Sequence, residues 1–347
     1  MAYDRYHVPE TPVGSDGWRE RAGTLARARV FLKATPGVEM PASAGPDLEC
    51  RYEPKDTTGT TPKFDCRLAD GHIVKVKYGL NPEIPGEVAA TRLLTSLGFA
   101  ADHMSIVRRV RCYGCPRSPY RSRQVAEWFF VAGVLDQFLD YRNYADFANA
   151  AVERKFEARA FEVDDHAGWA FHELDAVDAS RGGASRADVD ALRLMAVFLA
   201  HWDNKATNQR LVCLGDRGED GAAPCAEPLL MLQDLGATFG PKKVDYLGWK
   251  HAPIWRDPEG CMVSMAELPY RGATFPDVEI SEAGRRLLAS KLAVYDAVAI
   301  ANLFLSSNFP DAETGQVGAT NVQPWVEAFQ EKVAAITSRS CAPSPDR

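Results

Sequence analysis

The sequence contains no stretch that would anchor the chain in a membrane or direct it out of the cell. In its 347 residues, no window approaches the eighteen or so apolar residues of a transmembrane helix, and the N-terminus lacks the charged-then-apolar pattern of a signal sequence. There is also no Asn-x-Ser/Thr site, which disfavours passage through a glycosylating pathway. We therefore expect a soluble protein without a membrane span, resident in the cytoplasm.

The chain also has no excess of positive charge. It carries 40 Lys and Arg against 47 Asp and Glu, a net charge of -7. Broad nucleic-acid binding calls for a basic face, so we expect no nucleic-acid partner and interpret the arginine-rich stretch 108–123 as solvated or substrate-facing. With 46% hydrophobic and 25% charged residues, the chain can bury a sizeable core in one two-lobed unit or two small domains.

The eight cysteines include only one C-x-x-C pair, Cys112 and Cys115. No second such pair and no H-x-x-x-H motif completes a four-coordinate zinc site, and Cys50 or Cys66 would do so only if the fold brought it near. A disulfide between any two cysteines would imply an oxidising compartment. We favour a tight turn after a strand over residues 106–111, with reduced, buried or half-buried thiols.

The most informative stretch is H-W-D-N-K-A-T-N, residues 201–208, followed after a short apolar run by Q-D-L-G, residues 233–236. Before it, Ser185 and Asp188 form a capping-box pattern, and apolar residues at helical spacing predict a helix that ends just before His201. After it, residues 209–214 and 229–233 read as two short strands joined by a polar loop.

These residues resemble the active site of protein kinases. His201, Asp203, Lys205 and Asn208 stand at the positions of the H-R-D-x-K-x-x-N catalytic loop, and Asp234 opens an Asp-Leu-Gly in place of Asp-Phe-Gly. The resemblance implies that Asp203 meets the acceptor hydroxyl and Lys205 reaches the transferred phosphoryl group. His201 joins them as the third catalytic-loop residue, in a structural or a proton-carrying role. Asn208 and Asp234 would hold magnesium, which prefers hard oxygen ligands.

A kinase also needs a lysine for the phosphates, and residues 73–77 read as a strand that carries two. Lys75 and Lys77 share one face of this strand, so the sequence does not fully separate them; we favour Lys77 because it lies nearest the strand end. Glu87 lies in an amphipathic helix pattern over residues 85–94, where it would form the lysine–glutamate ion pair of kinases. The alternative is that Lys77 and Glu87 are surface charges.

A hydroxyl-rich turn over residues 57–63 precedes this strand. It does not match G-x-G-x-x-G, but threonine hydroxyls and backbone N–H groups can bind phosphate oxygens, which makes Thr58, Gly59, Thr60 and Lys63 candidate contacts. The segment T-G-T-T-P-K-F-D resembles the Ser-Gly-x-x-x-Lys turn of HipA-type kinases. Over residues 56–240 the chain thus looks like an uncharacterised, bacterial-type member of the atypical kinase branch, which includes HipA-type, lipid and secretory-pathway kinases.

The resemblance implies an α+β, bilobal protein-kinase-like fold with a small, mainly β N-terminal lobe and a larger, mainly α C-terminal lobe. We expect an N-terminal arm and linker over residues 1–47, loosely attached, a nucleotide-binding lobe with an insertion over 48–165, a catalytic lobe over 166–338 and a disordered tail over 339–347. The hinge is expected near residues 164–173. Residues 281–307 predict one or two helices, and residues 324–336 predict another.

The function implied is transfer of the γ-phosphate of ATP, with Mg²⁺, to a hydroxyl of a protein, lipid or small molecule. Two alternatives stay open. One is a kinase-fold pseudoenzyme that binds nucleotide or partners without transfer, and the other is a metabolite or antibiotic phosphotransferase.

Overall fold

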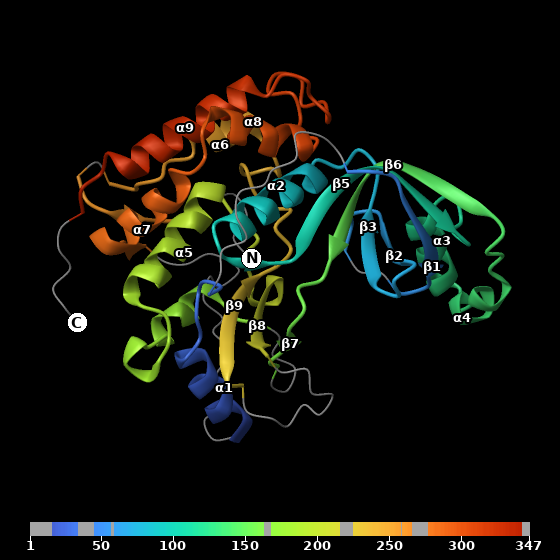
Figure 1. The fold of residues 1–347 in the computed structure, drawn as a ribbon, viewed down its shortest axis with the longest axis horizontal. Coiled ribbons are helices and arrows are strands. Elements are labelled where there is room, and N and C mark those ends of the chain that lie inside the picture. Colours follow the sequence, from blue (N-terminus) through green and yellow to red (C-terminus); the bar gives the residue numbers. More distant parts are fainter. Residues whose placement is uncertain are drawn as a thin grey trace, which may run out of the picture.

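The fold mixes helices and strands, as expected for the α+β class. The computed structural model describes residues 16–33, 45–56, 59–162, 168–215, 225–257, 259–265 and 277–341. Figure 1 shows most of the strands of the N-terminal half gathered at one end of the molecule and the helices of the C-terminal half at the other. Helix α2 (Glu83–Ser96) lies between these two parts (Figure 1).

Five strands form a closed barrel in the order β1-β2-β3-β6-β5. They are β1 (Leu48–Glu53), β2 (Lys63–Arg67), β3 (Ile73–Lys77), β5 (His103–Tyr113) and β6 (Tyr144–Arg154). All neighbours are antiparallel except β1 and β5. Strand side chains alternate between two faces, so apolar residues from these strands fill the barrel interior. The predicted strand 73–77 is therefore confirmed.

Helices α3 (Pro119–Trp128) and α4 (Ala132–Leu135) and the 3-10 helix η1 (Asp136–Phe138) connect β5 to β6. They lie at the outer end of the barrel (Figure 1). Tyr120 on α3 reaches back to the turn between β1 and β2, where its hydroxyl donates to the carbonyl of Gly59. The connection thus supports the turn that the sequence singled out.

A second sheet has the strand order β4-β9-β8-β7. It contains β4 (Ala100–Ala101), β7 (Arg159–Ala160), β8 (Gln209–Leu214) and β9 (Glu227–Leu232). Strands β8 and β9 are antiparallel, with the first residue of β8 opposite the last residue of β9. The segment that precedes β8 and the segment that follows β9 therefore meet at one edge of the sheet. This agrees with the two strands predicted on either side of the polar loop.

The helices after residue 185 bury the largest core. They are α5 (Arg186–Leu199), α6 (Tyr246–His251), α7 (Glu282–Leu292), α8 (Ala297–Ser306) and α9 (Gln323–Thr337). The capping box at Ser185 and Asp188 is present, and residues 281–307 form two helices. In the described parts of the chain, no single helix has the length and apolar character to cross a membrane; α7 and α8 meet that test only together, bent by 77°.

The smaller elements complete the connections. They are the 3-10 helices η2 (Phe171–Ala176), η3 (Ala179–Arg181) and η4 (Ala206–Asn208), and a two-stranded sheet of β10 (Met262–Val263) and β11 (Val278–Glu279).

The expectation of a loosely attached N-terminal arm was wrong for its described residues. Helix α1 (Asp16–Ala26) precedes a segment in which Arg29 pairs with Leu229 of β9, and Val30 is part of the largest core. The guanidinium of Arg21 is also buried against Glu173, 2.6 Å from its carboxylate. Apolar side chains of the arm pack beside the second sheet. The amino-acid composition of the arm does not predict this packing.

The expectation of reduced thiols was also wrong. All eight cysteines are paired, in the bonds Cys50–Cys66, Cys112–Cys115, Cys213–Cys225 and Cys261–Cys341. The fold brings the two Cα atoms of each pair within 5.4 to 5.7 Å, a separation that a disulfide spans. Cys341 ties down part of the predicted tail, whose residues 342–347 lie outside the described ones. Disulfides persist in oxidising compartments, and the cytoplasm is a reducing one.

Candidate active site

A polar cavity of about 410 Å³ gathers most of the residues that the sequence singled out. Its walls come from the β1–β2 turn, strand β3, helix α2 and the edge of the second sheet where β8 begins and β9 ends. Ten of the predicted site residues line it: Gly59, Thr60, Lys63, Lys75, Lys77, Glu87, Asp203, Lys205, Asn208 and Asp234. His201 does not line it, and Thr58 lies outside the described residues.

Lys77 and Glu87 form the ion pair that the sequence predicted. The Nζ atom of Lys77 lies 2.6 and 2.5 Å from the two carboxylate oxygens of Glu87, and the lysine is only 5% exposed. Burial opposes the charged form, but attraction by Glu87 and Glu153 outweighs it and raises the pKa of Lys77. The lysine is therefore a fixed positive charge at the inner end of the cavity.

Glu153 is a member of this charge cluster that the sequence did not indicate. It is the last residue but one of β6, directly opposite Lys75, and its carboxylate lies 2.9 Å from Lys75 Nζ and 3.6 Å from Lys77 Nζ. Burial alone would raise the pKa of Glu153, but Lys77, Lys75 and Lys155 together hold it below its usual value. Burial raises the pKa of Glu87 to about 7 in the same cluster. Only the pairing of β3 with β6 brings Glu153 here.

Lys63 differs from the other lysines of the cavity because it forms no ion pair with any described residue. It opens β2 opposite Lys77, beside the turn in which Gly59 adopts a left-handed backbone. Burial lowers the pKa of Lys63, and the neighbouring charges of Lys77 and Lys75 lower it further. An uncompensated cation among other cations is suited to an anionic ligand with several oxygens.

Residues 201–208, predicted from the sequence to form a catalytic loop, follow a sharp turn after α5, where Ala200 has a left-handed backbone with φ 50°. The carboxylate of Asp203 lies 3.2 Å from Lys205 Nζ, and about a quarter of the aspartate side chain is exposed to the cavity. The side-chain nitrogen of Asn208 donates to the backbone carbonyl of Asp203 at 2.6 Å. This bond fixes the asparagine and leaves its amide oxygen as the atom available to a ligand.

His201 lies beneath the loop and not in the cavity. It is 1% exposed, with Nε2 at 3.4 Å from the side-chain nitrogen of Gln209. Burial lowers the pKa of His201 to about 4. The ring is therefore neutral near pH 7, and it is not part of the cavity lining.

Asp234 presents its carboxylate from the end of the β8–β9 hairpin. The backbone N–H of Gln233 donates to the carbonyl of Asn208 at 3.0 Å, which holds the two segments side by side. Asp234 has a left-handed backbone with φ 52°, and its side chain is exposed, whereas the next residue, Leu235, is buried. The strained conformation turns the carboxylate toward the cavity and the leucine into the core.

Lys243 and Glu83 close another part of the cavity wall. The ammonium of Lys243 is ion-paired with the carboxylate of Glu83, the first residue of α2. Glu83 was not singled out from the sequence. Its pairing with Lys243 joins segments 160 residues apart, which no local pattern records.

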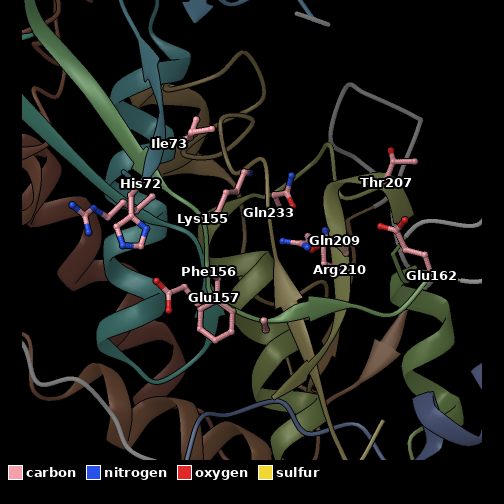
Figure 2. A pocket seen from close by; sticks show the side chains of 12 residues that line it. His72, Ile73, Lys155, Phe156, Glu157, Glu162, Thr207, Gln209, Arg210 and Gln233 are labelled. Carbon is pink, nitrogen blue, oxygen red and sulfur yellow. The ribbon is translucent and has the colours of Figure 1, made fainter. Parts of the chain in front are cut away.

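A second cavity, of about 590 Å³, adjoins the first, since Thr207 and Gln233 line both. Figure 2 shows Lys155, Phe156 and Glu157, which directly follow β6, facing Gln209 and Arg210 of β8 across it, with His72 and Ile73 nearby. The hinge was expected at residues 164–173. Residues 163–167 lie outside the described ones, and none of residues 168–173 lines either cavity.

No protein-family model and no curated protein matches this chain. Among solved structures, one that is similar is a Helicobacter pylori proinflammatory kinase, CtkA. The two chains are 12% identical, the match covers 84% of this chain and 94% of the other, and the TM-score is 0.43. One structural neighbour is thus a kinase.

Proposed function

We propose that this chain is an ATP- and Mg²⁺-dependent phosphotransferase that moves the γ-phosphoryl group to a hydroxyl acceptor. The observation that carries the proposal is one polar cavity. It is lined by the Lys77–Glu87 pair, by Lys63, which has no ion-pair partner among the described residues, and by Asp203 and Asp234. In this proposal the barrel with α2 is the small lobe of a bilobal kinase-like fold, and the helices after residue 185 form the large one.

The two adjoining cavities fit the two parts of a nucleotide. Phosphates match the cavity with five lysines, because Lys63 and Lys77 offer positive charge and the turn at Gly59 offers backbone N–H groups. The base matches the neighbouring cavity, where Phe156 supplies an aromatic surface. The hinge of the proposed fold is then the segment 155–158 after β6, upstream of the expected range.

Magnesium fits the donor set that Asn208 and Asp234 present. Both offer oxygen atoms to the cavity, one from an amide whose nitrogen is already bonded and one from an exposed carboxylate. Magnesium is held by one or two such groups together with phosphate oxygens and water. When bound, it would neutralise negative charge on the phosphates.

Asp203 and Lys205 supply the chemistry of the acceptor side. Asp203 accepts the proton of the acceptor hydroxyl, the hydroxyl oxygen bonds to the γ-phosphorus, and the bond from that phosphorus to the bridging oxygen of ADP breaks. Lys205, 3.2 Å from Asp203, is placed to offset charge on the transferred group. His201 acts as a positioning residue, since it is buried and neutral beneath the loop.

The test is a transfer assay with γ-labelled ATP and Mg²⁺. The purified chain is supplied with hydroxyl-bearing peptides, inositol lipids and aminoglycosides, and label in each acceptor and in the chain itself is measured together with ADP. The proposal expects Mg²⁺-dependent ADP formation that Asp203→Asn abolishes. Nucleotide binding without ADP formation would identify a nucleotide-binding protein without transfer.

A further inference from the structure

Four of the eight cysteines meet inside the barrel. The Sγ atoms of Cys50, Cys66 and Cys112 all lie within 4.8 Å of one another, and Cys115 is bonded to Cys112. Cys66 Sγ is 3.5 Å from Cys112 Sγ, although each is bonded to a different cysteine. The two disulfides therefore lie against each other: three of their sulfur atoms form one close group, and Cys115 is attached to it through its bond to Cys112.

Strand pairing explains why these cysteines converge. Cys50 on β1 stands directly opposite Cys112 on the parallel strand β5. Cys66 on β2 stands opposite Tyr52, two residues beyond Cys50 and so on the same face of β1. All three side chains consequently point into the barrel, where they belong to its buried apolar cluster.

The fourth cysteine arrives through a tight turn. Residues 112–115 form a C-x-x-C segment in which Gly114 has a left-handed backbone, φ 80°. A side chain at Gly114 would also collide with the ring of Tyr141, which lies 2.7 Å from the position of a Cβ atom. C-x-x-C is the spacing from which structural zinc sites take two of their ligands.

The chemistry of the group is that of a closed zinc site. Structural zinc takes four thiolates in a tetrahedron, buried and without an open position. All four cysteines here are buried, and among the described residues no histidine or carboxylate belongs to the group. The other disulfides, Cys213–Cys225 and Cys261–Cys341, form no such group in the described chain.

We propose that the four barrel cysteines bind one zinc ion when both disulfides are reduced. The Cys50–Cys66 disulfide joins only β1 to β2, whereas the zinc ion joins β5 to both of these strands. A phosphine reductant supplies two electrons to each disulfide and takes an oxygen atom from water, whose two protons go to the two new thiols. The four thiols then release four protons as their thiolates bind zinc. In a reducing compartment, where disulfides do not persist, the zinc form holds the barrel. The proposal is independent of phosphoryl transfer.

The first experiment uses the full chain, reduced with a trialkylphosphine under inert gas, freed of reductant and titrated with Co²⁺ and then Zn²⁺. We expect one Co²⁺ per chain, with the visible absorption of tetrahedral cobalt thiolate, and its displacement by one Zn²⁺. Cys213→Ser/Cys225→Ser, the matched control, retains this absorption, and Cys50→Ser/Cys112→Ser loses it. Absence of the absorption from the wild type, or its retention in Cys50→Ser/Cys112→Ser, overturns the proposal.

A second measurement needs no variant and therefore holds even if Cys50→Ser/Cys112→Ser does not fold. Reduced wild-type chain is alkylated with a maleimide, with and without one equivalent of Zn²⁺, and the modified cysteines are located by mass spectrometry. Zinc should slow alkylation of Cys50, Cys66, Cys112 and Cys115 several-fold and leave the other four cysteines unaffected. Equal rates with and without zinc, or equal protection of all eight, contradict the site.

Discussion

Lys77 Nζ lies 2.6 Å from a carboxylate oxygen of Glu87, and both side chains are almost fully buried at the inner end of the polar cavity. The pair joins the barrel to helix α2. A lysine held in this way is fixed before any ligand binds, so a nucleotide would not have to order it. The Lys77–Glu87 ion pair therefore contributes both to the stability of the barrel and to the proposed phosphate site.

Lys77→Met should lower both stability and nucleotide affinity, and should be more damaging than Lys75→Met. Removing one partner of a buried ion pair typically costs about 3–5 kcal/mol, because it leaves the other charge unpaired. Lys75 is a quarter exposed, so Lys75→Met should lower the free energy of unfolding by less. Urea unfolding and nucleotide titration measure the two effects. In the double variant Lys77→Met/Glu87→Gln, part of the stability lost in Lys77→Met should return, but the lost nucleotide affinity should not. A larger loss in Lys75→Met would exchange the roles of the two lysines.

Lys63→Met should separate affinity from stability. Burial and the charges of Lys77 and Lys75 lower the pKa of Lys63, so its removal relieves repulsion in the folded chain. We expect the melting temperature to be unchanged or higher. Nucleotide affinity should fall by about tenfold to a hundredfold, since a hydrogen bond to a charged group contributes about 1.5–3 kcal/mol. A stability loss with unchanged affinity would show that Lys63 is structural.

Asp203→Asn should remove transfer and spare nucleotide binding. General-base catalysis contributes about 10²–10⁴-fold, and an amide of the same size cannot accept the proton. Asp175→Asn, at an exposed aspartate outside both cavities, is the matched control. Initial rates with γ-labelled ATP give the comparison. Full activity in Asp203→Asn would remove this residue from the mechanism.

His201→Gln should change how stability depends on pH. Burial lowers the pKa of His201 to about 4, below an unfolded value of about 6.5. Between these values the unfolded chain binds a proton that the folded chain does not, so His201 destabilises the fold as pH falls through this window, by about 3 kcal/mol in all. Urea unfolding from pH 7 to 4.5 should show the wild type losing more stability than the variant. Parallel curves would contradict a buried neutral histidine.

The sequence predicted the elements around the catalytic loop because local rules determine them. A capping box marks the start of α5, and apolar residues at helical spacing continue to Leu199, where the helix ends. Two short apolar strands form a hairpin, and this hairpin places Asn208 beside Gln233. Glu153 and Lys243 were not singled out as site residues because their positions depend on which strands and helices pair, which spacing does not encode. The Cys50–Cys66 disulfide was missed for the same reason, because these two cysteines approach each other only across paired strands.

The most direct test of the account is thermal unfolding with ATP and Mg²⁺, added separately and together, for the wild type and Asp234→Asn. Asparagine tolerates the left-handed backbone at this position, so the variant tests the carboxylate and not the turn. A ligand at a hundred times its Kd stabilises the folded state by about 2.7 kcal/mol. The account predicts a rise in melting temperature that requires both ATP and Mg²⁺ and is lost in Asp234→Asn. No rise at millimolar ATP with Mg²⁺, or an equal rise in the variant, would contradict it.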